Sequence, residues 1–172
     1  MRDVEVTNTD DLIDSRDAIK HLERLEEERQ DLVDDLEAIQ DDLDELETTE
    51  AERKSNDLPV DEDSGEREEL EEDFNRADRR LFQFDRDYGD ELAYLRKFCA
   101  EGEQYSDDWR HGATLINDDY FENYARGFAE DIGAITRDTA WPATCIDWEA
   151  AALELQQAYS AIQFNGTTFW VR

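Results

Sequence analysis

The sequence predicts a mainly helical protein: a long antiparallel coiled-coil helical hairpin followed by a small α+β domain that ends in a β-hairpin. Two apolar series with alternating steps of four and three residues, separated by helix breakers, predict the helical hairpin. An Asn-Gly pair between two strand-like runs predicts the closing β-hairpin. We therefore divide the 172 residues into a polar lead-in (1–9), an acidic helical hairpin (10–101) and an α+β domain (102–172).

The first apolar series predicts a helix from about residue 10 to Lys54. Its members are Ala18, Leu22, Leu25, Arg29, Leu32, Leu36, Ile39, Leu43 and Leu46. This spacing places one apolar stripe, here called the seam, on a helix that packs against another helix. Thr9, Asp10 or Asp11 can cap the start of the helix. Arg29 is the polar member of the seam, and it can pair with an acid across the seam and so set the register.

The second apolar series predicts the returning helix. It follows a loop at residues 55–65, which holds the breakers Asn56, Pro59 and Gly65. Its members are Leu70, Phe74, Ala77, Leu81, Phe84, Tyr88, Glu91, Leu95 and Phe98. Two long helices joined by about a dozen residues can fold back antiparallel. The pattern leaves open whether the seams close within one chain or between the two chains of a homodimer.

The predicted α+β domain contains all four tryptophans and is less acidic than the helical hairpin. We expect one helix to start at Asp118 or Asp119 and to stop at Gly133. Asp147 can cap a second helix. A two-residue loop in the closing β-hairpin predicts two facing pairs, Phe164 with Thr167 and Ile162 with Phe169.

The net charge is extreme, with 49 acidic and 18 basic residues and a balance of −31. Direct binding to nucleic acid or to an anionic membrane is not expected, because phosphate contacts need Lys and Arg. The expected partner is therefore a basic protein. The start of the chain does not resemble a secretory signal, and no apolar run approaches the length of a membrane span. We expect a cytoplasmic protein of the host cell, with Cys99 and Cys145 reduced.

The sequence offers no clear catalytic or metal-binding set. His21 and His111 lack a nucleophile, or a second histidine, at an interpretable spacing. The segment from Asp61 to Glu72 resembles a calcium loop only superficially, because Glu66 stands where the sharp turn needs glycine. We therefore expect no enzymatic activity, no metal and no cofactor.

The acidic residues themselves are the candidate site. Carboxylates on successive helical turns lie about 5–6 Å apart, and phosphates along one DNA strand lie on the order of 6–7 Å apart. A rigid acidic helix could therefore occupy the DNA site of a DNA-binding protein. The candidate partner-binding residues are Glu23, Glu27, Asp31, Asp34, Asp35, Asp41, Asp42, Glu45, Glu62, Asp63, Glu69, Glu72 and Asp73. The alternative is a coiled-coil assembly or interaction protein of a phage, whose acidity only keeps it soluble.

Three C-terminal segments resemble a known family. They are Tyr124–Ile135 (YARGFAEDIGAI), Ile146–Leu155 (IDWEAAALEL) and the closing Phe169–Arg172 (FWVR). These segments are similar to the last part of ArdA-type antirestriction proteins and of related uncharacterised phage proteins. The resemblance implies an elongated acidic dimer that imitates B-form DNA and occupies the DNA site of Type I restriction enzymes. The family carries mixed helix and sheet domains where this chain has the predicted helical hairpin.

Overall fold

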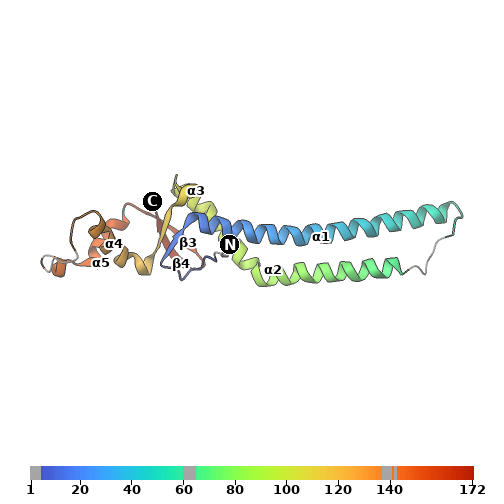
Figure 1. Cartoon of the computed structure of the whole chain (residues 1–172), viewed down its shortest axis with the longest axis horizontal. Coiled ribbons are helices and arrows are strands. Elements are labelled where there is room, and N and C mark those ends of the chain that lie inside the picture. Colours follow the sequence, from blue (N-terminus) through green and yellow to red (C-terminus); the bar gives the residue numbers. More distant parts are fainter. Residues whose placement is uncertain (1–4, 60–64, 137–140, 142) are drawn as a thin grey trace. The chain divides into compact units, whose positions relative to one another are not determined.

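The computed structural model describes residues 5–59, 65–136, 141 and 143–172, and it confirms the predicted fold class (Figure 1). Two long helices, α1 (Ser15–Ser55) and α2 (Glu66–Tyr105), are accompanied by short helices and a four-stranded sheet. The chain forms two compact units. Residues 24–90 make up the hairpin unit, and residues 1–23 together with 91–172 make up the sheet unit.

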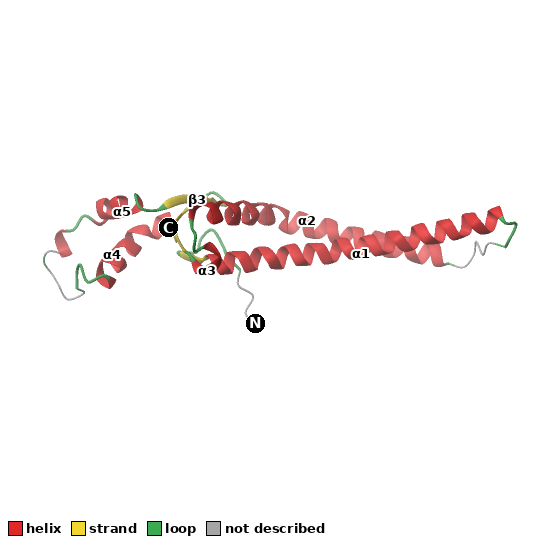
Figure 2. Ribbon diagram, turned by 90° about the horizontal axis from the view of Figure 1, so that it is seen from above, coloured by secondary structure: helices red, strands yellow, loops and turns green. Residues whose placement is uncertain are grey.

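Within the hairpin unit, α1 and α2 run antiparallel and side by side (Figures 1 and 2). The seam is buried at Leu25, Ala77 and Phe84. From Leu32 to Leu46 the seam residues of α1 are only half-buried. A single partner helix, α2, covers the apolar stripe of α1 from one side only. Part of this stripe therefore stays in contact with solvent.

The predicted start of the first helix, near residue 10, is wrong. Leu12–Asp14 forms strand β1, and α1 begins at Ser15. Burial of Ile13 in the sheet unit favours the extended backbone in this segment. The cap is Asp14, since its Oδ1 accepts the backbone N–H of Arg16 at 2.9 Å. The Arg16 guanidinium beside this carboxylate also lowers the pKa of Asp14.

The sheet joins both ends of the chain. Its strands are β1, β2 (Thr114–Asn117), β3 (Ser160–Phe164) and β4 (Thr167–Val171), in the antiparallel order β1-β2-β4-β3. The closing β-hairpin has the predicted register, with Phe164 facing Thr167 and Ile162 facing Phe169. Asn165 and Gly166 both have positive φ, 44° and 83°, as a two-residue hairpin loop of this kind requires.

The two helices predicted in the C-terminal region are confirmed. A short 3-10 turn, η1 (Asp118–Tyr120), leads into α4 (Phe121–Asp131), and Gly133 follows with φ of 73°. Asp147 caps α5 (Trp148–Gln156) by accepting the Ala150 N–H at 3.1 Å. The short helix α3 (Trp109–Gly112) and the 3-10 turn η2 (Ala143–Cys145) complete the elements.

An aromatic cluster fills the core of the sheet unit. Phe98 of α2 stacks on Phe164 of β3 with ring centroids 4.7 Å apart, and it meets Trp109 and Phe169 edge-on. His21 is also buried here, and its Nδ1 accepts the backbone N–H of Val6 at 3.1 Å. These contacts give His21 a structural role.

Gly102 and Gly89 of α2 make a matched pair for testing this core. A Cβ on Gly102 would overlap the ring of the buried Trp109, whereas a Cβ on Gly89 would meet no atom within 4 Å. We predict that Gly102→Ala lowers the free energy of unfolding by about 1–3 kcal/mol through overpacking. Gly89→Ala should raise it by roughly 0.5–1 kcal/mol through helix propensity.

Urea unfolding followed by far-UV circular dichroism measures both effects. Equal stability of Gly102→Ala and the wild type would contradict the packing of Trp109 against α2.

Candidate interaction surface

Arg29 joins the two helices of the hairpin unit near the buried end of the seam. Its Nε donates to Asp85 Oδ1 at 2.8 Å, and its Nη2 donates to Oδ2 at 3.3 Å. This confirms the predicted pairing of Arg29 with an acid across the seam. The hydrogen bond that Arg29 donates to Asp85 raises the pKa of the guanidinium. Both side chains are more than one third exposed, so the pair contributes roughly 0.2–1 kcal/mol and acts mainly on register.

Two arginines of α2 also form ion pairs with α1, in the same antiparallel register. Arg80 Nη1 lies 3.2 Å from Asp35 Oδ2, and Arg67 Nη2 lies 2.9 Å from Glu50 Oε2. The hydrogen bond to Glu50 raises the pKa of Arg67. The three ion pairs therefore connect the helices near both ends and in the middle of the hairpin unit, and they hold α1 in one position beside α2.

The predicted partner-binding residues lie mostly on the solvent-facing side of the helices. Glu23 is exposed but belongs to the sheet unit, and Glu62 and Asp63 lie outside the described residues. The other predicted residues are in the hairpin unit, and all but the half-buried Asp73 are exposed. Two of them also make ion pairs with the chain itself, Asp35 with Arg80 and Asp73 with Arg76.

The acidic face of α1 is continuous between its basic residues. From Arg29 to Arg53 the sequence has eleven acidic residues and no basic one. Glu27, Asp34 and Asp41 repeat every seven residues and therefore lie above one another on the helix. Glutamines support parts of this face, since Gln30 donates to Asp34 at 2.7 Å and Gln40 donates to Asp44 at 2.8 Å.

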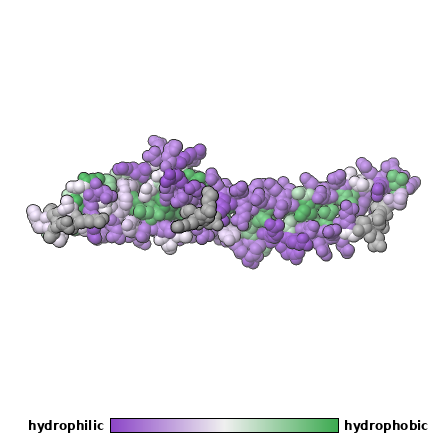
Figure 3. Space-filling model, viewed as in Figure 1, coloured by the Kyte–Doolittle hydropathy of each residue, from purple (hydrophilic) through white to green (hydrophobic). Residues whose placement is uncertain are grey.

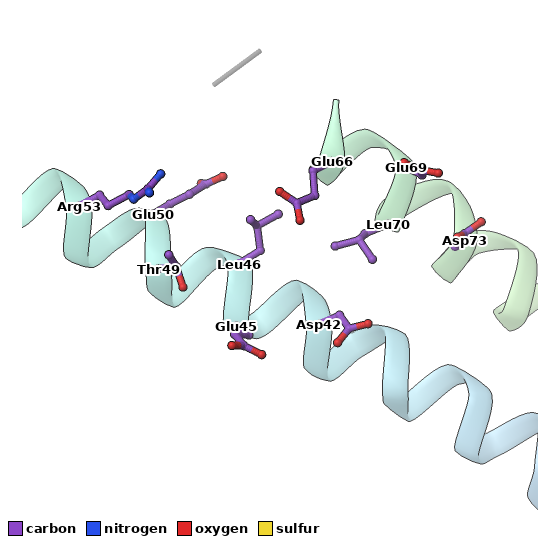
Figure 4. A pocket seen from close by; sticks show the side chains of 10 residues that line it. All are labelled: Asp42, Glu45, Leu46, Thr49, Glu50, Arg53, Glu66, Glu69, Leu70 and Asp73. Carbon is purple, nitrogen blue, oxygen red and sulfur yellow. The ribbon is translucent and has the colours of Figure 1, made fainter. Parts of the chain in front are cut away.

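A groove of about 800 Å³ lies between the helices where the apolar seam ends. We call it the distal groove; residues 42–53 of α1 and 66–73 of α2 line it. Figure 4 shows Leu46 and Leu70 projecting from the two helices toward the space between them. The next seam positions on the two helices hold the Glu50–Arg67 ion pair, which cannot pack as leucines do. The loss of apolar seam residues explains why the groove opens here.

The surface of the hairpin unit therefore combines charge with apolar contact. In the view of Figure 3, hydrophilic residues cover most of the unit, and an apolar strip shows between the two helices. The groove lining includes four of the predicted partner-binding residues, Asp42, Glu45, Glu69 and Asp73, and two acids that were not predicted, Glu50 and Glu66. The change from leucine to polar residues at the seam positions was the available signal.

Other kinds of site find little support in the described parts of the chain. No group of three or more His, Cys, Asp or Glu side chains there is arranged to hold a metal ion. Asp61–Ser64, which open the loop compared with a calcium site, fall outside those parts. Within the same residues, no helix is long and apolar enough to cross a membrane.

Comparisons with known proteins give no relative for this chain. No protein-family model, no curated protein and no solved structure matches it. The resemblance to ArdA-type proteins therefore stays a prediction that rests on the three C-terminal segments quoted above.

A charge swap tests the register role of Arg29. We predict that Arg29→Asp lowers the free energy of unfolding by about 1 kcal/mol, because an attraction to Asp85 becomes a repulsion. The double variant R29D/D85R should recover most of that loss. Urea unfolding at low and moderate salt measures the coupling energy between the two residues. The same charge swap at Arg76 and Asp73, an i,i+3 pair within α2, is the control. A swap variant no more stable than the sum of the single changes would contradict a direct pair.

Proposed function

We propose that the protein is a non-enzymatic inhibitor that imitates DNA and occupies the DNA site of a host defence protein. The observation that carries this proposal is the acidic face of α1, with eleven acidic and no basic residues between Arg29 and Arg53. An ordinary coiled coil balances such charges with lysines at flanking positions, because like charges on successive turns repel. This helix keeps them unbalanced, which favours a role for the charge itself.

The spacing of the charges agrees with the proposal in magnitude. The segment between Arg29 and Arg53 is about 35 Å long at 1.5 Å per residue, so it carries one acidic group per about 3 Å. One strand of DNA carries one phosphate per about 3.4 Å of axis, and a duplex carries one per about 1.7 Å. The acidic segment of α1, counted around the whole helix, therefore has the linear charge density of one strand.

Rigidity supports the same proposal. A DNA-binding groove recognises phosphates at fixed positions, so an imitation gains affinity when its charges are held in place before binding. The ion pairs of Arg29, Arg80 and Arg67 attach α1 to α2 along the hairpin unit. They use Asp35 and Glu50 of the acidic segment and leave the other nine carboxylates out of these cross-helix pairs.

The resemblance to ArdA-type antirestriction proteins is consistent with this reading. In this proposal the chain comes from a phage or another mobile element and acts in the cytoplasm of the host cell. Its target is a restriction enzyme, a CRISPR effector or a nuclease. The hairpin unit departs from the mixed helix and sheet domains of that family, so the target need not be the family's own. A homodimer is part of the proposal, and sedimentation of the chain measures it.

The second candidate is an assembly or interaction coiled coil. The half-buried seam from Leu32 to Leu46 favours it, because such a stripe can pack against another helix. The sheet unit is also acidic, with 21 acidic and 9 basic residues, which agrees with acidity that serves solubility in general. The two candidates differ in what competes for the partner, since only a DNA mimic competes with duplex DNA.

The test is capture of proteins from a host lysate on the immobilised chain at physiological salt, followed by elution with excess duplex DNA. We predict that a DNA-binding defence protein elutes. In a purified competition assay the chain should then displace a labelled duplex from that protein, and its affinity should fall as salt rises. Recovery of only the chain itself or of a structural partner, with nothing released by DNA, would overturn the proposal.

Two variants with the same change in charge locate the contact. The first neutralises four exposed acids of α1 (D31N/D34N/D41N/E45Q), and the second neutralises four exposed acids of the sheet unit (E5Q/D107N/D131N/E154Q). We expect the first to weaken displacement roughly tenfold or more, and the second to act like the wild type. Equal loss in both variants would show an effect of net charge alone and would contradict imitation by α1.

A further inference from the structure

We propose that the distal groove is a docking site for an amphipathic helix of a protein partner, in which an apolar anchor is flanked by lysine and arginine. The inference rests on the proposed function in one respect, that the partner is basic. The inference adds an apolar contact between the groove and the partner. Imitation of DNA phosphates does not require such a contact.

The apolar part of the groove belongs to the seam. Leu46 and Leu70 project toward the same space and are half-buried, although both stand at seam positions. Leu43, Ile39 and Leu36 continue the half-buried stripe along α1. A third helix laid against this stripe would bury it from the side that α2 leaves open. Recognition of an amphipathic helix in an apolar groove uses anchors at i, i+3, i+4 and i+7, the spacing of this seam.

The rim of the groove is acidic. Asp42, Glu45 and Glu69 are exposed beside the two leucines, and Glu66 and Asp73 also line the groove. Lysine and arginine can lay their apolar stems over leucines while their charged ends reach carboxylates. A helix with basic residues on both sides of an apolar anchor therefore complements both features of the groove.

Charge also decides between this occupant and a second copy of the chain. Residues 24–90 hold 28 acidic and 9 basic residues, so two hairpin units would face each other with like charge. The groove lining repeats this imbalance, since Arg53 is its one basic side chain among the described residues. A small uncharged ligand would make no charge-assisted contact with the exposed carboxylates of Asp42, Glu45 and Glu69. A basic helix satisfies the rim and the leucines together.

The experiment measures binding of a defined probe to the full chain by isothermal titration calorimetry. The probe is an acetylated helical peptide of about 18 residues with leucines on one face and lysine and arginine elsewhere. Its control is an isomer of the same composition whose leucines are spread around the helix. Measurements at about 0.15 M and about 0.5 M NaCl separate anchored binding from surface attraction, which salt screens.

We expect the amphipathic probe to bind at both salt concentrations and the isomer to lose its binding at the higher one. L46Q/L70Q should weaken the amphipathic probe roughly tenfold or more, while L153Q, an exposed leucine of α5, should not. Since L46Q/L70Q can also loosen the hairpin unit, E45Q/E69Q provides a second groove variant that leaves the seam intact. It should weaken binding, and D78N/D90N, with the same charge change at exposed residues of the hairpin unit outside the groove, should not.

The outcomes separate this inference from imitation of DNA. Equal binding of the two peptides, or unchanged binding in both groove variants, overturns the groove as a docking site. If D31N/D34N/D41N/E45Q nevertheless weakens displacement of the labelled duplex in the competition assay, the acidic face still acts as proposed. Sedimentation of a wild-type dimer that L46Q/L70Q converts to a monomer, without any change in peptide binding, would make a second copy the occupant and would also overturn the inference.

Discussion

Repulsion between like charges along α1 is the constraint on which the hairpin unit depends. Eleven carboxylates stand between Arg29 and Arg53, and each like pair one turn apart opposes the helix by a few tenths of a kcal/mol. Burial of Leu25 and Phe84 near the Arg29 end of the seam, and of Ala77 near its middle, offsets this repulsion. Arginines offset it farther out, since most of the cross-helix cations come from α2. The result is a helix that is tied on its inner side and remains negative on its outer side.

The parts of the fold that the sequence predicts are those governed by local rules. The seam follows from a spacing that recurs over 29 residues of each helix, and the register of the closing β-hairpin follows from the positive φ that Asn165 and Gly166 tolerate. The cap at Asp147 and the stop at Gly133 depend on neighbouring residues only. For the acidic face, helical periodicity alone predicts which side chains lie away from the seam.

The parts that escape prediction depend on residues far apart in the chain. Strands β1 and β2 are short and are stabilised by pairing with distant parts of the chain, β1 with β2 (Leu12 with Ile116) and β2 with β4 (Ile116 with Trp170). Neither run shows enough alternation to be read alone, so Asp14 was not identified as the cap of α1. The distal groove was not predicted because it forms where the apolar pattern of the seam stops. The ion pair of Asp35 with Arg80 likewise needs the register of both helices, which one helix does not reveal.

The chain runs through the two long helices between two strands that are neighbours in the sheet. β1 precedes α1 and β2 follows α2, yet the two strands are hydrogen-bonded neighbours. The long helices are thus an insertion between two adjacent strands. Removal or addition of one heptad in each helix would change the length of the acidic face by about 10 Å and keep both seams in phase. Every strand pair would stay as it is. The length of the acidic face and the structure of the sheet can therefore vary independently.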